Sequence, residues 1–361
     1  MGSMGTEAQI PVIDIRASNP DAPRQLLDAA TRYGFVFIEN KDTGVDVADI
    51  NFMFDLSRQF FASPIEVKEE VSINSNKAGK NHGWLSQGVE KLDPATQKRP
   101  DVKEYVPNSS INPPVPVDHI ARAFNMGEPV HGAFQQALPA PLKPHAQTLL
   151  AFQARCLALC HQILRLVARA LDIDEHWFTV RHSQPGNPAP SSTVFRMLYY
   201  PHLANPDSGL DLRAGAHSDF GSLTLLFQQL GQPGLEIKTP SGDWAAVPVD
   251  PHESSSESHA LPILVNIGDL LEDWTGGLLR STVHRVIFSP PTDGDGDGGG
   301  DRYSMAYFCQ PLDEALLEPV PSRLVQEHIC RTGGRSGARG GKVITARDHL
   351  MERLAATYTV K

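Results

Sequence analysis

The sequence predicts a mainly β core with helices, in which a sandwich or barrel is flanked by an α-helical N-terminal region and a C-terminal helix. Two observations support this prediction. Between residues 187 and 310, short runs rich in β-branched and aromatic residues alternate with Gly, Pro and Asp turns, which is typical of sandwiches and barrels. Before that region, apolar residues recur at three- and four-residue spacings, which is typical of helices.

The N-terminal region is expected to alternate between strands and helices. The runs IPVIDI (residues 10–15) and YGFVFIEN (residues 33–40) are short and β-rich. Between them a helix is expected to begin near Asp21. The run at residues 46–63 predicts a second amphipathic helix, which Pro64 ends.

A long polar stretch at residues 68–116 follows, with few periodic signals. Loops of this length are usually functional lids or unstructured, and within it Gln87–Tyr105 is a candidate for covering a site. The strongest helix signal comes next, at His145–Ile173. Its apolar stripe consists of Leu149, Phe152, Cys156, Cys160, Ile163, Val167 and Leu171.

Short β-rich runs make up the predicted core. They are STVFRMLYYP, SLTLLFQ, GLEIKT, AAVPVD, ILVNIG, STVHRVIFS and RYSMAYFCQ. The acidic, Gly-rich run Thr292–Asp301 separates the last two, and we expect it to be a hairpin insertion. A calcium-binding EF-hand is not expected there, because helices and not strands would flank it. Finally, the run Ile344–Tyr358 predicts a closing helix.

Composition and charge argue against several functions. The chain has 361 residues, a net charge of −10 and a pI near 5.8. Nucleic acids and anionic membranes need clustered Lys and Arg, so neither partner is expected, and no apolar run reaches transmembrane length. The four cysteines form no CxxC pair and resemble no disulfide framework. A reducing, cytoplasmic location is therefore predicted, and the oligomeric state is left open.

A histidine and an aspartate open the run HSDFGSLTLLFQ. His217 and Asp219 are two residues apart, and alternate residues of a strand point to the same face, so both side chains are expected to project together. A second imidazole comes from His284, whose same-face neighbours in the run STVHRVIF are mostly apolar. Two histidines and one carboxylate on one side of a metal form the facial triad of non-haem Fe(II) oxygenases. We therefore predict a metal site at these three residues.

A candidate carboxylate receptor lies on two neighbouring runs. One face of the predicted strand RYSMAYF carries Arg302, Ser304, Ala306 and Phe308. The run FRMLYYP aligns Arg196, Leu198 and Tyr200 in the same way. A buried guanidinium is costly unless it meets an anion, and an arginine with a hydroxyl binds a carboxylate well. A tyrosine hydroxyl beside Arg302 would complete the clamp.

Together these motifs resemble the iron(II)/2-oxoglutarate-dependent dioxygenases, in the branch similar to isopenicillin N synthase. The HSD run, the STVHRV histidine and RYS look like the family pattern His-x-Asp…His…Arg-x-Ser, and the resemblance extends over nearly the full chain. Within this family, the sequence most resembles fungal thymine dioxygenase-like members. The spacing from His284 to Arg302 is longer than usual in the family, and the run Thr292–Asp301 accounts for the excess.

The resemblance implies a double-stranded β-helix, or jelly roll, that binds Fe(II) through the three predicted ligands. 2-Oxoglutarate would chelate the iron, and its far carboxylate would meet Arg302, Ser304 and Tyr200. O2 is the second co-substrate, and ascorbate is a candidate reductant. The implied reaction releases succinate and hydroxylates, desaturates or cyclises a small molecule, and a fungal secondary metabolite is the expected substrate.

The resemblance also suggests how the chain is divided. Residues 1–125 form an N-terminal α/β region that contributes to the substrate pocket, 126–186 a long supporting helix, 187–312 the catalytic core, and 313–361 a C-terminal helical segment. The substrate-pocket candidates are Arg196, Leu198, Phe220 and Phe308. Gln87–Tyr105 and the C-terminal helix are expected to cover the iron, and such covering segments set specificity.

Three alternatives remain at this point. One is an oxidase of the isopenicillin N synthase type, which uses the same iron without 2-oxoglutarate. Another is nucleobase oxidation like that of a thymine 7-hydroxylase, and the third is a non-catalytic jelly-roll binding module. The presence of all three ligands and the carboxylate clamp argues against a binding module. Iron content and succinate production distinguish an oxidase or a binding module from a 2-oxoglutarate-dependent enzyme. Identifying the substrate shows whether the enzyme oxidises a nucleobase.

Overall fold

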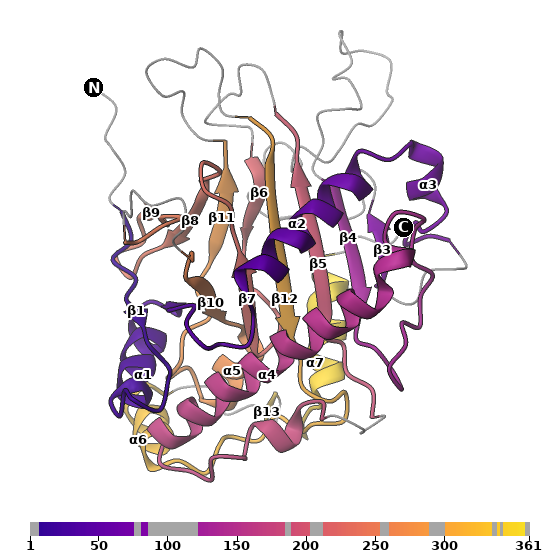
Figure 1. The fold of residues 1–361 in the computed structure, drawn as a ribbon. Helices are drawn as coiled ribbons and strands as arrows, with labels where there is room; N and C mark the ends of the chain where they lie inside the picture. The colour runs from indigo at the N-terminus through magenta and orange to yellow at the C-terminus, as the bar shows by residue number, and fades with distance from the viewer. Residues whose placement is uncertain are drawn as a thin grey trace, which may run out of the picture.

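The computed structural model describes residues 7–75, 81–85, 122–184, 189–202, 212–252, 260–288, 300–333, 338–339 and 342–357. Two β-sheets form its centre, and helices cover the outer face of the larger sheet (Figure 1). The segment Gln87–Tyr105 and most of the run Thr292–Asp301 lie outside the described residues.

The larger sheet has eight strands in the order β1-β2-β10-β7-β12-β5-β4-β3. Its neighbouring strands are antiparallel except for the parallel pair β1 and β2. The strands are β1 Val12–Ile13, β2 Phe35–Ile38, β3 Gly83–Leu85, β4 Arg122–Gly127, β5 Val194–Tyr200, β7 Leu223–Phe227, β10 Ile263–Ile267 and β12 Arg302–Cys309. Because β1 to β3 come from the predicted N-terminal region, that region is built into the same sheet as the core. The predicted four-part division of the chain stays a prediction.

The smaller sheet has four antiparallel strands in the order β6-β11-β8-β9. These strands are β6 Leu212–His217, β8 Leu235–Lys238, β9 Trp244–Ala246 and β11 His284–Ile287. A separate pair consists of β13 Ala338–Arg339 and β14 Lys342–Val343. The two main sheets, with the chain crossing between them, form the predicted double-stranded β-helix.

Strand residues of the larger sheet alternate between two apolar cores. In β2, Phe35 and Phe37 belong to the core that includes residues of the smaller sheet, whereas Val36 and Ile38 belong to the core under the helices. This follows from the alternation of side chains along a strand. A sheet that is covered on both faces requires near-continuous apolar strands, which explains runs such as FVFI and ILVNI.

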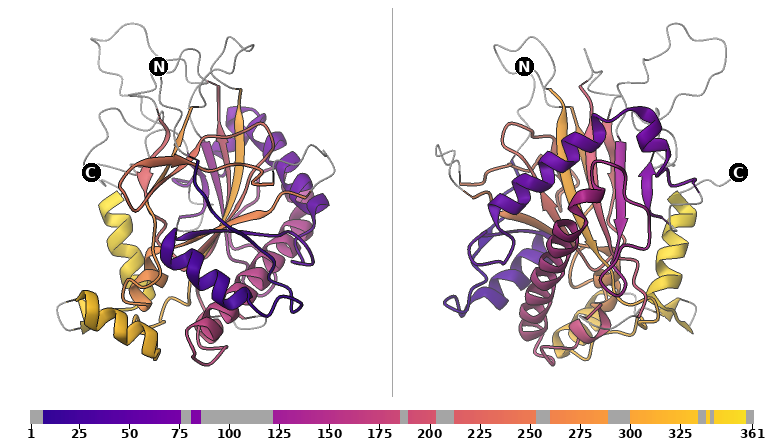
Figure 2. Two further views of the ribbon diagram at one scale, coloured as in Figure 1. Left: turned by 90° about the vertical axis from the view of Figure 1, so that its left-hand side faces the viewer. Right: turned by 45° about the vertical axis from the view of Figure 1, so that its right-hand side comes forward.

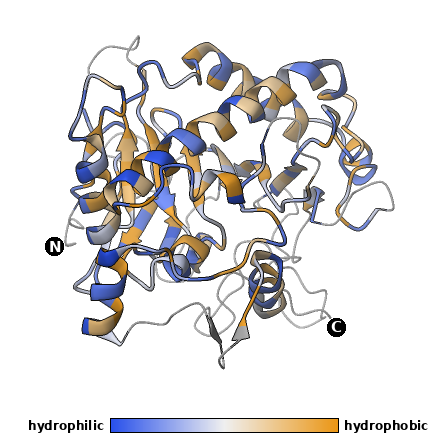
Figure 3. Cartoon of the chain, turned by 90° about the horizontal axis from the view of Figure 1, so that it is seen from below, coloured by the Kyte–Doolittle hydropathy of each residue, from blue (hydrophilic) through white to orange (hydrophobic). Residues whose placement is uncertain are grey.

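Helices lie on both sides of the β core. They are α1 Ala22–Arg32, α2 Val47–Phe61, α3 Ile65–Glu69, α4 Ala146–Ala170, α5 Asp269–Trp274, α6 Arg323–Thr332 and α7 Ala346–Thr357, with short 3-10 helices at Lys143–His145 and Thr179–Arg181. Figure 1 shows α2 and α4 crossing the larger sheet, and Figure 2 shows α7 on the opposite side of the core. The covering helices carry both polar and apolar residues, whereas the inner strands are mostly apolar (Figure 3).

The predicted apolar stripe of α4 is confirmed, because each of its seven residues is at most 2% exposed. With the turn before it, this helix spans Lys143–Ala170 and is long and apolar enough to cross a membrane by length and composition alone. The sequence was not expected to contain such a run. Half of its most apolar window is buried inside the protein, which is the pattern of a helix that packs its stripe on a core.

The predicted hairpin at Thr292–Asp301 is wrong. The strand before it, β11, pairs with β6 and β8, whereas the strand after it, β12, pairs with β5 and β7. The chain therefore passes from the smaller sheet to the larger one between these strands. Sheet membership depends on long-range pairing, and a Gly-rich run between two strands indicates only that the chain turns there.

Other predicted elements are confirmed, and several were missed. The helices expected near Asp21, at residues 46–63 and at the C-terminus are present, as are strands in all the predicted β-rich runs. The elements that the sequence did not reveal are the strands β3, β4, β6, β13 and β14 and the helices α3, α5 and α6. These are short or mixed in character, so their local periodicity is weak.

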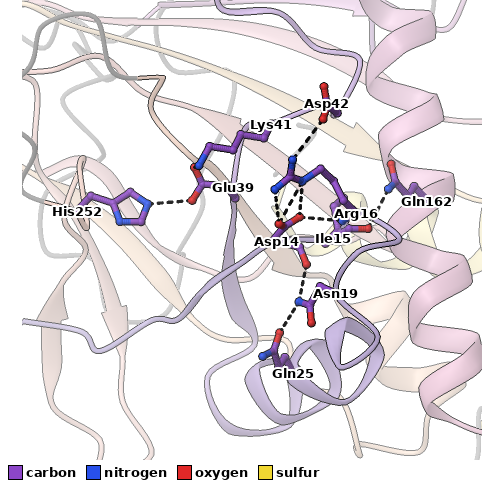
Figure 4. Close-up of polar contacts among 10 residues, drawn as sticks. All are labelled: Asp14, Ile15, Arg16, Asn19, Gln25, Glu39, Lys41, Asp42, Gln162 and His252. Carbon is purple, nitrogen blue, oxygen red and sulfur yellow. Dashed lines mark hydrogen bonds and ion pairs between the residues drawn. The ribbon is translucent and has the colours of Figure 1, made fainter.

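Polar contacts attach the N-terminal segment to the rest of the fold (Figure 4). Arg16 donates through Nε and Nη2 to the carboxylate of Asp14, at 3.0 and 2.7 Å, and lies 3.5 Å from Asp42. The side chain of Gln162 in α4 donates to the carbonyl of Ile15 at 3.2 Å. The stretch that follows β1 is thereby held against the helix layer.

Candidate metal centre

The three predicted ligands meet at one place, although not by the predicted route. His217 is the last residue of β6, and Asp219 lies beyond it, in the loop that leads to β7 in the other sheet. The prediction that both share one face of a single strand is therefore wrong. His284 begins β11 and is the direct pairing partner of His217. Cross-strand pairing, and not the spacing of two residues, brings the imidazoles together.

The ligand atoms of this cluster are close to one another. Nε2 of His284 lies 3.7 Å from Oδ1 of Asp219, and Nε2 of His217 lies 3.9 Å from the same oxygen. One ligand atom from each of the three residues lies within 4.8 Å of the others. Within the part of the chain that the structure describes, no other group of His, Cys, Asp or Glu side chains meets this condition.

Hydrogen bonds on the far side of each imidazole direct its lone pair into the cluster. Nδ1 of His217 lies 2.7 Å from the carbonyl oxygen of Gly215, and Nδ1 of His284 lies 3.1 Å from that of Thr282. A carbonyl oxygen only accepts, so each Nδ1 carries a proton. In the neutral ring Nε2 then keeps its lone pair, which is the form that binds a metal.

The carboxylate of Asp219 is prepared in the same way. Its Oδ2 accepts from Thr224 Oγ1 at 2.6 Å and from Asn266 Nδ2 at 2.8 Å, which leaves Oδ1 facing the two imidazoles. Burial by itself raises the pKa of Asp219, but attraction to the imidazoles of His284 and His217 in their protonated form, together with these hydrogen bonds, outweighs burial and lowers it. Two imidazole nitrogens and one ionised oxygen that converge from one side fit Fe(II).

Backbone contacts fix the loop of Asp219 on the start of α5. The amide of Asp269 donates to the carbonyl of Asp219 at 2.8 Å. A Cβ on Gly268 would overlap the carbonyl oxygen of Gly221, so glycine is needed for this close approach. Neither Gly268 nor Asn266 was predicted as part of the site. Both belong to the run VNIGD, and nothing local in that run indicates which loop it contacts.

The three ligands line a cavity that Arg302 also lines. Arg302 is buried, with 1% of its surface exposed. Its Nη1 donates to Ser304 Oγ and its Nε to the carbonyl of Gln232, both at 3.2 Å. Tyr200 is its pairing partner, with the ring centroid 5.4 Å from the guanidinium carbon. Arg302 forms no ion pair with a carboxylate of the described residues, and burial lowers its pKa. A buried cation of this kind favours an anionic ligand.

A second buried arginine, which the sequence reasoning missed, strengthens the positive potential. Arg213 in β6 is 3% exposed, donates to the carbonyl of Gly300 at 2.7 Å and lies 4.8 Å from the ring centroid of Phe288. Burial, followed by the charge of Arg302, lowers the pKa of Arg213 to about 10. Two guanidinium groups that repel one another are stabilised when an anion binds beside them.

One cavity is lined by every residue that the sequence predicted for the site. These are His217, Asp219, His284, Arg302, Ser304, Tyr200, Arg196, Leu198, Phe220 and Phe308. Further lining residues were not predicted, among them Asn81 beside β3 and Leu350 and Leu354 in α7. They come from segments far away in the sequence, so only the fold reveals them.

The strand register orders the cavity lining. Arg302 pairs with Tyr200 at the beginning of β12. Near the other end of β12, Phe308 pairs with Thr224 of β7, and Thr224 holds Asp219. Arg302 therefore lies at one end of β12, and the Thr224 that holds Asp219 lies beside the other end. The clamp and the metal ligands line the same cavity.

Comparisons with known proteins agree with this geometry. The pattern of the 2OG-Fe(II) oxygenase superfamily matches residues 191–311, and that of the non-haem dioxygenase in morphine synthesis N-terminal region matches residues 10–126. A protein of Schizosaccharomyces pombe, UPF0676 protein C1494.01, is 32% identical over 331 residues, which cover 89% of this chain and 86% of that protein. The chain belongs to the 2OG-Fe(II) oxygenase superfamily.

Two further relatives specify the activity of this oxygenase. The 2-oxoglutarate-Fe(II) type oxidoreductase ppzD of Metarhizium majus is 31% identical over 303 residues, covering 81% of this chain and 80% of that enzyme. The solved thymine-7-hydroxylase of Neurospora crassa, in complex with alpha-KG and thymine, is 26% identical with a TM-score of 0.72, over 99% and 98% of the two chains. The enzyme is a non-haem iron, 2-oxoglutarate-dependent dioxygenase. The alternatives of a binding module and of an oxidase independent of 2-oxoglutarate are therefore set aside.

Proposed function

We propose that His217, Asp219 and His284 hold the Fe(II) of this dioxygenase and that Arg302 binds the far carboxylate of 2-oxoglutarate. One observation carries this proposal. A single cavity joins a cluster of three ligands to a buried guanidinium that has no carboxylate partner among the described residues. A dicarboxylate that reaches from the metal to Arg302 supplies the missing charge. Ser304 adds a hydroxyl beside that carboxylate.

The chemistry and the role of the chain can be separated. When bound, Fe(II) with 2-oxoglutarate and O2 supplies the oxidation of a substrate C–H bond, with release of succinate and CO2. The side chains of this protein bind and orient the reactants. The protons on both Nδ1 atoms fix the ring orientations of His217 and His284, and apolar lining residues such as Leu198 keep water from the site.

The primary substrate is proposed to lie between Arg196 and Phe220. Arg196 is half-buried, donates through Nε to Asn125 Oδ1 at 2.7 Å, and has its guanidinium carbon 5.4 Å from the ring centroid of Phe308. Phe220 directly follows Asp219 and lines the same cavity. These residues suit a small molecule with a flat apolar part and an oxygen that accepts a hydrogen bond from arginine.

A secondary metabolite is the substrate class that we propose. The similar fungal enzymes, among them ppzD, support this class. Nucleobase oxidation is the second candidate, because the thymine-7-hydroxylase that resembles this fold was solved with thymine. Both kinds of molecule can offer a carbonyl group to Arg196, so the geometry alone accommodates either.

Succinate release across a substrate panel tests the proposal. The full chain is supplied with Fe(II), 2-oxoglutarate, ascorbate and O2, together with thymine, cyclic amides or aromatic carbonyl compounds. We expect one panel member to stimulate succinate release with matching product. Arg196→Met should weaken that stimulation, whereas Arg24→Met, on the exposed face of α1, should not. Product without succinate would contradict the proposed co-substrate site.

We also propose a cytoplasmic location. Cys156, Cys160 and Cys309 are buried thiols, Cys330 is an exposed thiol, and none is in a disulfide. Free thiols fit a reducing compartment. Microscopy of the chain fused to a fluorescent protein at either end tests this location, and a signal confined to a secretory compartment would contradict it.

A further inference from the structure

The C-terminal helix α7 forms one wall of the cavity. Leu350 and Leu354 lie one helical turn apart, so they share a face of the helix, and both line the cavity. Leu350 is 8% exposed. Figure 2 shows α7 (yellow) on the side of the β core away from α2 and α4. This helix therefore contributes an apolar part of the cavity wall.

Arg353 connects α7 to the loop that carries Asp219. Its Nη2 donates to Ser218 Oγ at 3.0 Å and pairs with Asp269 Oδ2 at 2.5 Å. Its guanidinium carbon lies 5.0 Å from the ring centroid of Phe220. Ser218 and Phe220 are the two neighbours of Asp219 in the chain. Residues 218–222, between β6 and β7, are called the metal loop from here on. Arg353 therefore contacts the metal loop on both sides of Asp219.

Asp269, the carboxylate partner of Arg353, also holds the metal loop in place. Asp269 is 14% exposed in its side chain, and its amide donates to the carbonyl of Asp219 at 2.8 Å. Its other carboxylate oxygen accepts from Ser281 Oγ at 2.6 Å. The Arg353 side chain is itself only partly buried, but an ion pair whose carboxylate is mostly buried and accepts a further hydrogen bond is harder to open than a fully exposed pair.

The first turn of α7 has a tether of its own. Arg347 Nη1 pairs with Asp313 Oδ2 at 3.0 Å, and the amide of Ala346 donates to the carbonyl of Ala315 at 2.8 Å. Asp313 and Ala315 follow β12 and are not part of the metal loop. The two arginines therefore hold the same helix to different places, which provides a matched comparison.

We propose that Arg353 is a positioning residue that holds the Leu350 and Leu354 wall of α7 against the loop of the metal ligands. The wall then closes the substrate end of the cavity and keeps the bound substrate next to the metal. This inference rests on the proposed function of the cavity. The role concerns substrate fit, because Arg353 contacts Ser218 and Phe220, the chain neighbours of Asp219, and Phe220 lines the cavity.

Hydrogen exchange on the full chain loaded with Mn(II) and 2-oxoglutarate tests this without any substrate, since Mn(II) replaces Fe(II) and turnover does not occur. Arg353→Met should speed amide exchange in residues 350–354 and 218–222, with unchanged affinities for Mn(II) and 2-oxoglutarate. Arg347→Met should speed exchange only in the first turn of α7. Arg353→Lys should restore part of the protection, because it keeps the charge near Asp269 but loses the fork of the guanidinium.

A second measurement uses Fe(II) and the substrate that the panel identifies. The ratio of product to succinate should fall on the order of tenfold in Arg353→Met, because small misplacements of a reactant reduce rates steeply. It should stay at the wild-type value in Arg347→Met. Leu354→Ala should lower the ratio with Arg353 still in place, which assigns the effect to the wall.

Several outcomes overturn the inference. Equal exchange at residues 218–222 in Arg353→Met and Arg347→Met would mean that Arg353 is an ordinary tether. Weaker Mn(II) binding in Arg353→Met would mean that it acts on the metal ligands themselves. If the panel yields no substrate, the proposed substrate class fails, and the exchange experiment still decides on Arg353.

Discussion

His217 and His284 are direct partners across β6 and β11, and their ring centroids lie 4.4 Å apart. Both imidazoles also lie close to Oδ1 of Asp219. Replacing His217 by Ala should abolish turnover and weaken Fe(II) binding, because two ligands remain of three. The fold should be retained, since the ring of His217 is partly exposed. Metal titration and circular dichroism check both parts.

The control for this change is His252→Ala, which removes an imidazole that contacts Glu39 at the surface. It should bind Fe(II) like the wild type. Full Fe(II) affinity and turnover in His217→Ala would refute the assignment of the ligands.

Thr224 and Asp219 allow a subtler test of the same centre. Thr224→Val keeps the shape of the side chain but removes the 2.6 Å hydrogen bond to Asp219 Oδ2. Loss of a group that orients a metal ligand typically costs about 10–100-fold in metal affinity or activity. We expect a loss of that size in Fe(II) titrations. Thr239→Val, at an exposed turn, is the matched control, and equal affinities in the two variants would count against this role.

Arg302 should control the requirement for 2-oxoglutarate. Loss of one partner of a buried, hydrogen-bonded charge pair costs about 2–5 kcal/mol, or about thirty- to several-thousand-fold in affinity. Arg302→Ala should therefore weaken 2-oxoglutarate binding to the Mn(II)-loaded protein by such a factor. Arg302→Lys should recover only part, because an ammonium lacks the planar fork of donors.

Arg213→Met is the matched loss of a second buried guanidinium. It should weaken 2-oxoglutarate binding less than Arg302→Ala does, because Arg213 does not line the cavity and acts through its charge. If Arg302→Ala weakened binding of the primary substrate alone, Arg302 would be part of the substrate site and not of the 2-oxoglutarate site.

His182 should make the fold sensitive to acid. It is fully buried, its Nδ1 donates to the carbonyl of Phe178 at 2.8 Å, and its Nε2 accepts from Ser222 Oγ at 2.9 Å. Burial lowers its pKa from 6.5 to about 4. As pH falls below about 6.5, His182 takes up a proton in the unfolded chain but stays neutral in the folded chain. The free energy of unfolding therefore decreases by up to about 3 kcal/mol as pH approaches 4.

Denaturant unfolding of the metal-free protein between pH 7 and pH 4 measures this effect. The wild type should lose more stability on acidification than His182→Gln, although the variant starts less stable at pH 7. His176→Gln, which removes an exposed imidazole, should keep the wild-type dependence. Identical slopes in His182→Gln and the wild type would contradict the prediction.

How much of the site could be predicted depended on the kind of information involved. Arg302, Ser304 and Phe308 were placed on one cavity face correctly, because alternation along a strand is a local property. His217 and Asp219 were found for a reason that proved wrong. Their residue types and spacing were informative, but the chain changes sheets between them. The pairing of His217 with His284 depends on register between distant strands.

The sequence by itself determined the chemistry of this protein and the periodicity of most of its helices and strands. Imidazole, carboxylate and guanidinium groups have the same chemistry wherever the chain carries them, and amphipathic periods depend only on neighbouring residues. Tertiary structure alone decided which sheet each strand joins, that β11 and β12 form no hairpin, and that Arg353 of α7 contacts the metal loop. These relationships arise from contacts between distant segments, whose free energies depend on the whole packed core and leave no local pattern in the sequence.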